Sequence, residues 1–418
     1  MEKYAETVRD LMKSMEPEFF EIFRHCHEHP ELSLKEHDTT KYIKEMLTSL
    51  DIEILEIDGL ETGVVGLLKG KKDGPCIGLR ADIDGLPIME ESSSPYPSLN
   101  PGVMHACGHD THYASLLCAA KILAKMRDEL HGSVKFLFQP AEEINQGAKM
   151  MVRLGCLENP RVDAIFGMHN SPEIPLGTVA VKNGPLMAGV DRINLTIKGK
   201  GGHGGIPQKN EDPIVAAAAI IQSLQTIVSR NISPLQSAVV SVCNVKAGNG
   251  TTNNVCPDEV KMYGTVRTYK QEHKYFMDRR IREIVEGIAA AYHTEGISEY
   301  IYELPVTDNT RRPGWPDLFK IANEAVVGAG AEPVDPEASG GGEDFSIYVE
   351  GFEGHAGVPG FFYWLGVRNE QTDCVYSWHS PHFKADAECI PIGAGVYALS
   401  ALYGCQQIEV SKTDSKDA

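Results

Sequence analysis

The segment from His105 to His112 concentrates side chains that can bind a metal ion. It reads His-Ala-Cys-Gly-His-Asp-Thr-His, so three histidines and one cysteine fall within eight residues. Cys107 and His109 stand two apart where a loop is expected to enter a helix, so both can face one centre. Thiolate and imidazole are good ligands for zinc and similar transition ions. Packing alone explains such a segment poorly, and it therefore indicates a metal site.

Two adjacent carboxylates, Glu142 and Glu143, come just after a strand that the sequence predicts at 134–138. They would lie at the carboxyl edge of a sheet, where sites form in open α/β folds. One carboxylate can bind a metal while the other acts as a general base. Taken alone the pair is weak evidence, because most adjacent glutamates are solvated surface residues.

Three more segments carry polar side chains at strand ends or near the C-terminus. His169 directly follows a predicted strand, and Asp82 follows another, where an aspartate can orient a ligating histidine. A distant ligand can come from His379 or His382. Ligands from so many separate segments suit two metal ions, which together lower the pKa of water and polarise a carbonyl.

A glycine-rich run, 199–205, surrounds His203. Glycines let the backbone turn tightly and approach a ligand closely, and His203 can donate a hydrogen bond to a developing oxyanion. A plain glycine-rich hairpin explains the run equally well. Asn254 offers hydrogen bonds and Arg267 offers a fork suited to a substrate carboxylate, although an arginine on a strand is more often a surface charge.

Bringing distant strand ends together requires a particular scaffold, and the order of predicted elements supplies one. In the first half, strands rich in Val, Ile, Leu and Phe alternate with helices, which is typical of an α/β domain with a mostly parallel central sheet flanked by helices. The expected strands are 63–69, 76–81, 134–138 and 164–168, and the expected helices are 3–28, 36–50, 110–125 and 145–154.

Between residues 187 and 303 the pattern changes to strand–helix–strand–strand–helix–strand, the order of a ferredoxin-like α+β domain. The expected strands are 192–197, 237–245, 260–267 and 299–303, and the helices are 213–229 and 270–292. The α/β pattern then returns, with helices at 314–327 and 390–404 and a strand at 360–365. We therefore expect a discontinuous catalytic domain, 1–186 plus 304–418, interrupted by a smaller domain, 187–303.

Composition narrows the class of protein. The 418 residues carry a formal net charge of −19 and no block rich in Lys and Arg, so neither nucleic acid nor a membrane is an expected partner. The N-terminus lacks the apolar core of a signal peptide, and no run of about 18 apolar residues predicts a spanning helix. Ten cysteines are scattered without a Cys-x-x-Cys pair, which favours free thiols and a cytoplasmic location.

Together the motifs resemble the aminoacylase, carboxypeptidase G and indole-acetyl-amino-acid hydrolase superfamily of metallopeptidases. The resemblance is strongest to the branch of hippurate hydrolases, indole-acetyl-amino-acid hydrolases and N-acetyldiaminopimelate deacetylases. It covers nearly the whole chain and rests on seven segments in order: 24–31, 80–87, 105–112, 139–143, 199–203, 341–345 and 379–381.

The resemblance implies a ligand set for two divalent metal ions. Cys107 would bridge the ions, and His109, Glu143, His169 and His379 would complete the set. Zinc or manganese is expected, with cobalt or nickel as alternatives, because a mixed site of thiolate, imidazole and carboxylate accepts several ions.

The resemblance also assigns roles around the metals. Glu142 would be the general base that takes a proton from water and passes it to the leaving amine, and Asp82 would support the site. His203 would stabilise the oxyanion, in this family often in the partner subunit's site. Asn254 and Arg267 would bind the carboxylate or carbonyl of the substrate.

The smaller domain is implied to be a lid that closes on substrate and joins two chains into a homodimer, possibly within a larger oligomer. Two positions depart from the family pattern. Gln208 stands where a histidine usually follows a proline, and Cys256 stands where isoleucine is usual. Both departures bear on the substrate, because the lid shapes the pocket.

The function implied is metal-dependent hydrolysis of an N-acyl amino acid, or a related small N-acyl compound, to a carboxylate and a free amine. A dipeptidase or carboxypeptidase of the same superfamily is an alternative, although those branches generally hold aspartate at the position of Cys107. Cys107 could instead be a nucleophile with His109 or His112 as its base, which predicts activity that survives chelators. A non-catalytic binding protein would usually lack a ligand or the base.

Overall fold

The computed structural model describes residues 2–310 and 317–414. The chain forms two compact units, each interrupted in sequence. The larger unit comprises the residues up to Leu186, those from Asp308 to Glu337 and those from Asp344 on. The smaller unit comprises Met187–Thr307 and Ala338–Glu343.

This division differs from the predicted one, which assigned every residue after 303 to the larger domain, at residues 304–307 and at the short segment Ala338–Glu343. The Ala188 N–H is 3.0 Å from the carbonyl oxygens of both Ser339 and Gly341, so the segment pairs with the start of the smaller unit. A Cβ on Gly342 would lie 2.2 Å from Val190. Such long-range backbone pairing leaves no periodic signal in the sequence.

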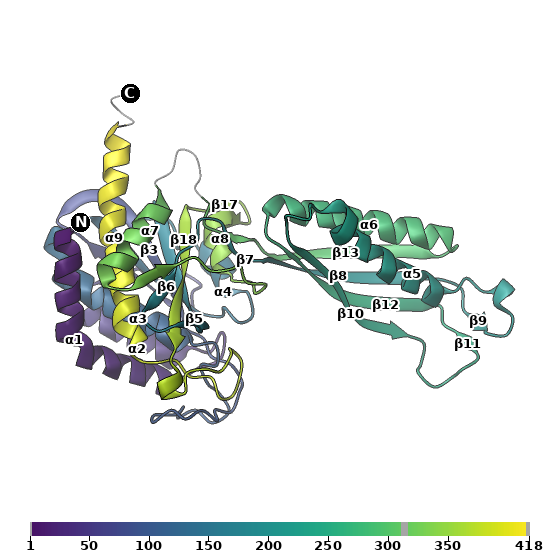
Figure 1. Ribbon diagram of the computed structural model, residues 1–418, viewed down its shortest axis with the longest axis horizontal. Helices are drawn as coiled ribbons and strands as arrows, with labels where there is room; N and C mark the ends of the chain where they lie inside the picture. Colours follow the sequence, from purple (N-terminus) through teal and green to yellow (C-terminus); the bar gives the residue numbers. More distant parts are fainter. Residues whose placement is uncertain (1, 311–316, 415–418) are drawn as a thin grey trace. The chain divides into compact units, whose positions relative to one another are not determined.

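An eight-stranded sheet forms the centre of the larger unit, in the order β1-β2-β4-β3-β5-β18-β6-β15 (Figure 1). The four neighbouring strands β4, β3, β5 and β18 run parallel, which confirms the predicted α/β class. The bounds are Glu53–Ile54 (β1), Val64–Lys69 (β2), His131–Gln139 (β4), Lys72–Asp82 (β3), Ala164–Pro175 (β5), Gly360–Arg368 (β18), Thr178–Ala180 (β6) and Glu332–Val334 (β15).

The central strands are buried on both faces, as β3 illustrates. Every residue of β3 from Pro75 to Asp82 is buried, the pattern of a parallel strand covered by helices on both sides. The strand β5 is longer than predicted because its pairing with β18 continues past His169 to Pro175. His169 therefore lies within β5 rather than beyond its end.

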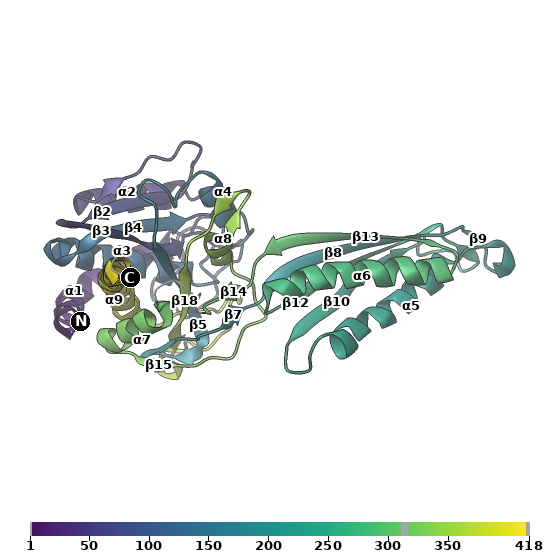
Figure 2. The same cartoon turned by 90° about the horizontal axis from the view of Figure 1, so that it is seen from above.

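Helices cover this sheet (Figures 1 and 2). They are α1 (Glu2–Glu28), α2 (His37–Ser49), α3 (His109–Lys125), α4 (Gly147–Arg153), α7 (Leu318–Ala329), α8 (Phe345–Glu350) and α9 (Cys389–Asp414). Helices α1, α3, α7 and α9 pack against one another. The predicted helix 314–327 appears as α7, and its first residues lie outside the described part of the chain.

Apolar periodicity explains why α1 forms and which face it buries. Its buried residues recur at spacings of three and four, which is the stripe of an amphipathic helix; they include Val8, Met12, Met15, Phe19 and Ile22. These side chains belong to the single large core of the unit.

The smaller unit is a ferredoxin-like sandwich, as its element order predicted. Its sheet has the order β10-β12-β8-β13, with antiparallel neighbours throughout. The bounds are Gly189–Lys198 (β8), Pro213–Thr226 (α5), Ala238–Ala247 (β10), Glu259–Thr268 (β12), Gln271–Ala291 (α6) and Glu295–Leu304 (β13). A separate two-stranded ladder joins β9 (Gly202–His203) to β11 (Val255–Cys256).

Helix α5 is unusually apolar for a helix on a small sheet. With the helical turn that follows it, Pro213–Asn231 is long and apolar enough to cross a membrane, with a mean hydropathy of 1.2 and 33% of its residues buried. Its inner face packs Ala216, Ile220 and Leu224 into the core of the smaller unit. Its outer face leaves Ile214 and Val215 exposed.

Candidate metal centre

The parallel strands bring three of the candidate segments to one edge of the sheet. Asp82, the last residue of β3, pairs in register with Gln139, the last residue of β4. The next strand, β5, carries His169, which lies opposite Trp364 of β18. The carboxyl ends of parallel strands therefore converge as expected for an open α/β sheet.

Five predicted ligands lie together at this edge. The ligand atoms of Cys107, His109 and His169 lie within 4.8 Å of one another, and so do those of Cys107, Glu143 and His379. Cys107 belongs to both groups, which is the position that a residue bridging two ions must take. His109 and Glu143 also meet in a third group with Glu142.

The unsatisfied polar atoms of the cluster test whether a metal fits. Within the described part of the chain, His109 Nε2 and Glu143 Oε1 are both buried without a hydrogen-bond partner, and they lie 3.9 Å apart. Buried polar atoms rarely remain unsatisfied. Two bonds of roughly 2 Å each, typical of imidazole and carboxylate ligands, would span this separation. The residues present therefore fit a divalent metal ion.

The tautomers of two histidines are set for metal binding. His169 Nδ1 donates to the Asn170 carbonyl oxygen at 2.7 Å, and its Nε2 lies 3.4 Å from Cys107 Sγ. His109 Nδ1 lies 3.2 Å from Asp84 Oδ1. A hydrogen bond to one ring nitrogen leaves the lone pair of the other nitrogen directed at the metal.

Asp82 has a less direct place than predicted. Its carboxylate accepts hydrogen bonds from Arg80 at 3.0 Å and from His112 Nδ1 at 2.5 Å, and it lies 3.8 Å from His109 Nε2. The aspartate that bonds the candidate ligand His109 is Asp84. Asp84 lies two residues after the end of β3, in the segment where the sequence predicted that an aspartate orients a ligating histidine.

A tight turn after β4 presents the two glutamates. Ala141 has a φ of 55°, and a Cβ on Gly147 would lie 1.7 Å from the Pro140 carbonyl oxygen, so only glycine fits there. The Glu143 N–H donates to Asp84 Oδ2 at 3.1 Å, which ties the turn to the end of β3. Glu142 is buried and its Oε2 lies 3.9 Å from His109 Nε2.

The choice between His379 and His382 was open from the sequence. His379 lies 3.6 Å from Glu143 Oε2 through its Nε2, and its backbone N–H donates to the Ala106 carbonyl oxygen at 2.8 Å. His382 Nδ1 instead donates to the Glu91 carbonyl oxygen. His379 is therefore the histidine of this segment that joins the cluster.

Whereas Asp82 and Asp84 outweigh burial at His109 and raise its pKa, burial favours the uncharged form of three other residues of the cluster. It raises the pKa of the Cys107 thiol and of Glu143, and it lowers the pKa of His169. Each shift favours the uncharged form, because a low-dielectric interior penalises charge. A neutral His169 is the form that binds metal, while a thiolate and a carboxylate in this position require positive charge beside them.

The smaller unit brings His203 and Asn254 together. His203 pairs with Val255 in the ladder of β9 and β11, and the Gly204 N–H donates to the Asn254 carbonyl oxygen at 2.8 Å. The Gly205 N–H donates to His203 Nδ1 at 2.9 Å, so the proton of a neutral His203 resides on Nε2. His203 is exposed, and this N–H is available as a donor.

Arg267 lies away from that pair. It pairs with Val190 near one end of the sheet, whereas the β9–β11 ladder follows the other end, beyond the pair of Glu259 and Lys198. From 190 to 198 is eight residue steps, or about 27 Å along a strand. The Arg267 guanidinium donates to the carbonyl oxygens of Gly340 at 3.2 Å and Val266 at 3.0 Å.

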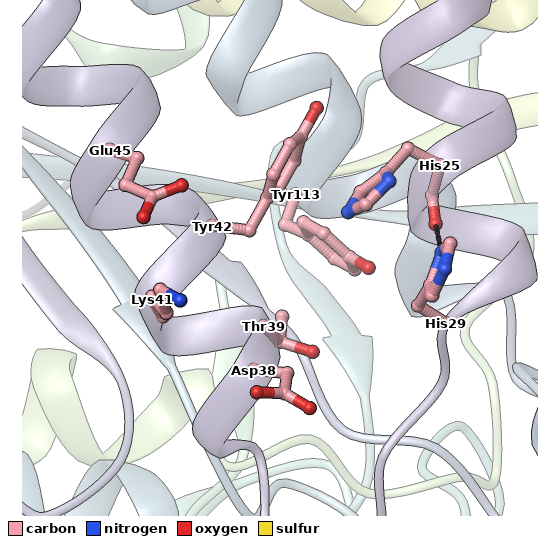
Figure 3. Close-up of a pocket in the computed structure, with 8 residues that line it drawn as sticks. All are labelled: His25, His29, Asp38, Thr39, Lys41, Tyr42, Glu45 and Tyr113. Atoms are coloured by element: carbon pink, nitrogen blue, oxygen red, sulfur yellow. Dashed lines mark hydrogen bonds between the residues drawn. The ribbon is translucent and has the colours of Figure 1, made fainter.

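A pocket separate from the cluster lies between α1 and α2 and has a volume of about 260 Å³. Figure 3 shows the hydrogen bond on one side of it, from the His29 ring to the His25 backbone carbonyl oxygen. The histidines near the end of α1 therefore line a different space from the metal ligands. The lining residues are His25, His29, Asp38, Thr39, Lys41, Tyr42, Glu45 and Tyr113.

Comparison with known proteins adds an independent observation. Residues 78–402 match the family described as peptidase family M20/M25/M40. N-acetylcysteine deacetylase of Bacillus subtilis is 45% identical over 397 residues, covering 95% of this chain and 99% of that protein. Thermostable carboxypeptidase 2 of Saccharolobus solfataricus is 37% identical over 401 residues, covering 95% and 98%.

A solved structure is similar over the same span. The YXEP protein of Bacillus subtilis, described as a dinuclear metal binding peptidase from the M20 family, superposes with a TM-score of 0.82 at 41% identity. The match covers 95% of this chain and 100% of that one.

Proposed function

The chain belongs to peptidase family M20/M25/M40 and is a metal-dependent amide hydrolase, and on that premise we propose that it deacylates N-acyl amino acids. The products are a carboxylate and an amino acid with a free amine. One observation carries the proposal: a cluster of Cys107, His109, Glu143, His169 and His379, of which His109 and His169 are buried, in a chain 45% identical to an N-acetylcysteine deacetylase.

Two divalent ions held by this cluster would polarise the scissile carbonyl and make water a stronger nucleophile at neutral pH. Zinc or manganese suits the mixed ligands, and cobalt or nickel would bind similarly. The protein's own residues hold the attacking water and the substrate carbonyl close together in a fixed orientation. They also exclude bulk solvent, as the burial of His109 and His169 supports.

Glu142 is the proposed general base. It adjoins the ligand Glu143, is buried, and has a carboxylate oxygen 3.9 Å from the unsatisfied nitrogen of His109. In this position it can accept a proton from the attacking water and deliver it to the leaving nitrogen, so one carboxylate serves both half-steps.

The smaller unit supplies substrate contacts in this proposal. His203 donates from Nε2 to the oxyanion, Asn254 bonds the carbonyl, and Arg267 pairs with the substrate carboxylate. The distance of His203 from Arg267 within one unit, on the order of 27 Å, means that one site cannot use both from the same chain. We therefore propose that His203 and Asn254 serve the site of a second copy.

A homodimer through the smaller unit would provide that second copy. Strand β10 is an edge strand, and its Val239 and Val245 side chains are exposed. Helix α5 leaves Ile214 and Val215 exposed as well. An unpaired edge beside apolar side chains is a surface that proteins normally cover. Sedimentation of wild type against a Val239→Lys, Val245→Lys variant tests this: a dimer should become a monomer.

We propose that the protein works in a reducing compartment, the cytoplasm, because the cysteines form no disulfide in the described part of the chain. All ten cysteines are free, including the proposed bridging ligand. A thiolate ligand that is oxidised no longer binds metal. Fractionation of the native source tests the location.

The decisive experiment compares wild type with Glu142→Gln on a panel of N-acyl amino acids and N-blocked dipeptides. We expect wild type to bind two ions per chain and to cleave N-acyl amino acids, and Glu142→Gln to keep the ions and lose turnover. Preferential cleavage of blocked dipeptides would favour the carboxypeptidase alternative, which the 37% identical thermostable carboxypeptidase supports. Activity that survives chelators would contradict the metal mechanism.

A further inference from the structure

Asn170 stands at the centre of the hydrogen bonds around the metal centre, although its side chain binds no metal in the proposed ligand set. It directly follows His169 on β5 and its side chain is fully buried. The Asn170 Nδ2 group donates to the Cys107 carbonyl oxygen at 2.7 Å. The Asn170 Oδ1 atom accepts from Trp378 Nε1 at 3.0 Å.

These two contacts fix the orientation of the amide. A carbonyl oxygen only accepts and an indole N–H only donates, so Nδ2 must face Cys107 and Oδ1 must face Trp378. Aspartate would place an oxygen against the Cys107 carbonyl, and an apolar side chain would leave both partners unsatisfied. The position therefore requires an amide.

The backbone of Asn170 contributes as well. Its carbonyl oxygen accepts from His169 Nδ1, and its N–H donates to His112 Nε2 at 2.8 Å. The other nitrogen of His112 bonds Asp82, which bonds the buried Arg80. Asn170 is thereby anchored to α3 and to the end of β3.

The segments that Asn170 joins are those that carry ligands. Trp378 immediately precedes His379, and the His379 N–H bonds the Ala106 carbonyl oxygen next to Cys107. A Cβ on Gly108 would lie 2.3 Å from Asn170 Nδ2, so the loop also needs glycine to approach the amide. Two contacts connect the segment of Trp378 and His379 to the Cys107 loop. One is the hydrogen bond from the His379 N–H, and the other runs through the Asn170 side chain.

We propose that Asn170 is a positioning residue: its side chain holds three ligand-bearing segments of the metal centre at a fixed separation. This inference rests on the proposed ligand set. The segment of His379 is the most exposed of the three, so losing the amide weakens chiefly the ion that His379 would bind. The other ion, near His109 and His169, keeps its own hydrogen bonds.

Metal titration of the full-length chain tests this. Zinc is titrated into metal-free wild type, Asn170→Leu and Trp378→Phe in competition with a chromophoric chelator, and thermal unfolding of each metal-free protein is recorded. We expect one of two ions to bind about 10–100-fold more weakly in Asn170→Leu, the usual cost of losing a partner behind the ligands. Trp378→Phe, which loses the indole donor but keeps an aromatic ring beside His169, should show a smaller loss at the same ion.

Trp364→Phe is the matched control. Trp364 stacks on Trp378 with ring centroids 5.6 Å apart, yet within the described part of the chain its indole makes no hydrogen bond to Asn170. We expect this variant to bind both ions as wild type does. If Asn170→Leu fails to fold, Trp378→Phe takes its place in the comparison. Equal metal affinities of Trp378→Phe and Trp364→Phe then overturn the inference.

The two proposals fail in distinguishable ways. Wild type that binds two ions, with Asn170→Leu binding both equally tightly, overturns the positioning role alone. Wild type that binds no pair of ions overturns the ligand set and this inference with it.

Discussion

The metal centre and the polar residues of the smaller unit differ in how firmly hydrogen bonds hold their side chains. Around the metal centre His109 and His169 are buried and second hydrogen bonds fix their rings, whereas His379 is exposed. In the smaller unit His203 and Asn254 are exposed on a two-stranded ladder, and few contacts hold their side chains. In this account the first region can bind metal before substrate arrives, and we expect the second to gain its partners only with substrate.

This contrast predicts which property a substitution changes in each region: metal binding and stability in the first, turnover in the second. A buried ligand set must be desolvated and oriented during folding, so its defects should appear as lost metal or lost stability. An exposed donor costs the fold little, so its removal should appear in turnover alone.

The largest effect is expected from a matched pair of cysteines, one in each unit. Cys107→Ser should lose activity by at least about a thousandfold together with bound metal, because it removes the ligand shared by both groups. Cys256→Ser, on β11, should keep its metal and most of its activity. The metal content and kcat/KM of both variants test this prediction. Equal losses in the two variants would contradict the difference between the metal centre and the smaller unit.

A pair of arginines separates stability from binding. Arg80 is fully buried between Asp82 and Asp344, so Arg80→Met removes the buried positive charge that pairs with these two carboxylates and should cost about 3–5 kcal/mol in unfolding free energy. Arg267→Met, which is partly exposed, should leave urea unfolding nearly unchanged and raise KM. An unfolding midpoint for Arg80→Met equal to that of wild type would show that the buried network is dispensable.

The oxyanion role of His203 predicts a loss confined to kcat. His203→Ala should lower kcat on the order of a hundredfold, the usual cost of one such donor, with metal content and thermal stability unchanged. His379→Ala should instead lose metal. If His203→Ala lowers metal content, the division between the two regions is wrong.

The smallest expected effect is a dependence of folding stability on pH, which comes from the buried His27. His27 bonds Asp110 at 2.6 Å and Glu90 at 3.2 Å; burial alone would lower its pKa, but these carboxylates raise it to about 10. Its contribution, on the order of a few kcal/mol, should be complete below pH 6.5 and disappear as pH rises towards about 10.

Urea unfolding of His27→Gln across this range measures that contribution. His25→Gln is the control with the opposite sign, because burial and then His29 lower the pKa of His25. Its contribution should be present at high pH and diminish as pH falls. A difference between wild type and His27→Gln that grows with pH would contradict the charged His27 network.

Sequence reasoning found the elements and the candidate ligands because both leave local signals. The parallel strands appear as apolar runs, and Cys107, His109 and Glu143 stand in short, unusual motifs. The element order also predicted the ferredoxin-like sheet. In these parts the ligand-bearing motifs and the apolar patterns each occupy only a few consecutive residues.

Long-range hydrogen bonds were not readable in the same way. The attachment of Ala338–Glu343 to the smaller unit depends on backbone pairing with Ala188. Asn170 and Trp378 are 208 residues apart, and neither stands out by type. The pairing of Asp84 with His109 had only a weak signal, a second aspartate two residues after Asp82. Such partners emerge only when the strands are assembled.

The most direct test of the account is a crystal structure of the full chain with metal, with ions located by anomalous scattering. The account predicts two peaks per chain, with Cys107 coordinating both and His109, Glu143, His169 and His379 completing the ligands. A single ion, or two ions that Cys107 does not join, would contradict it.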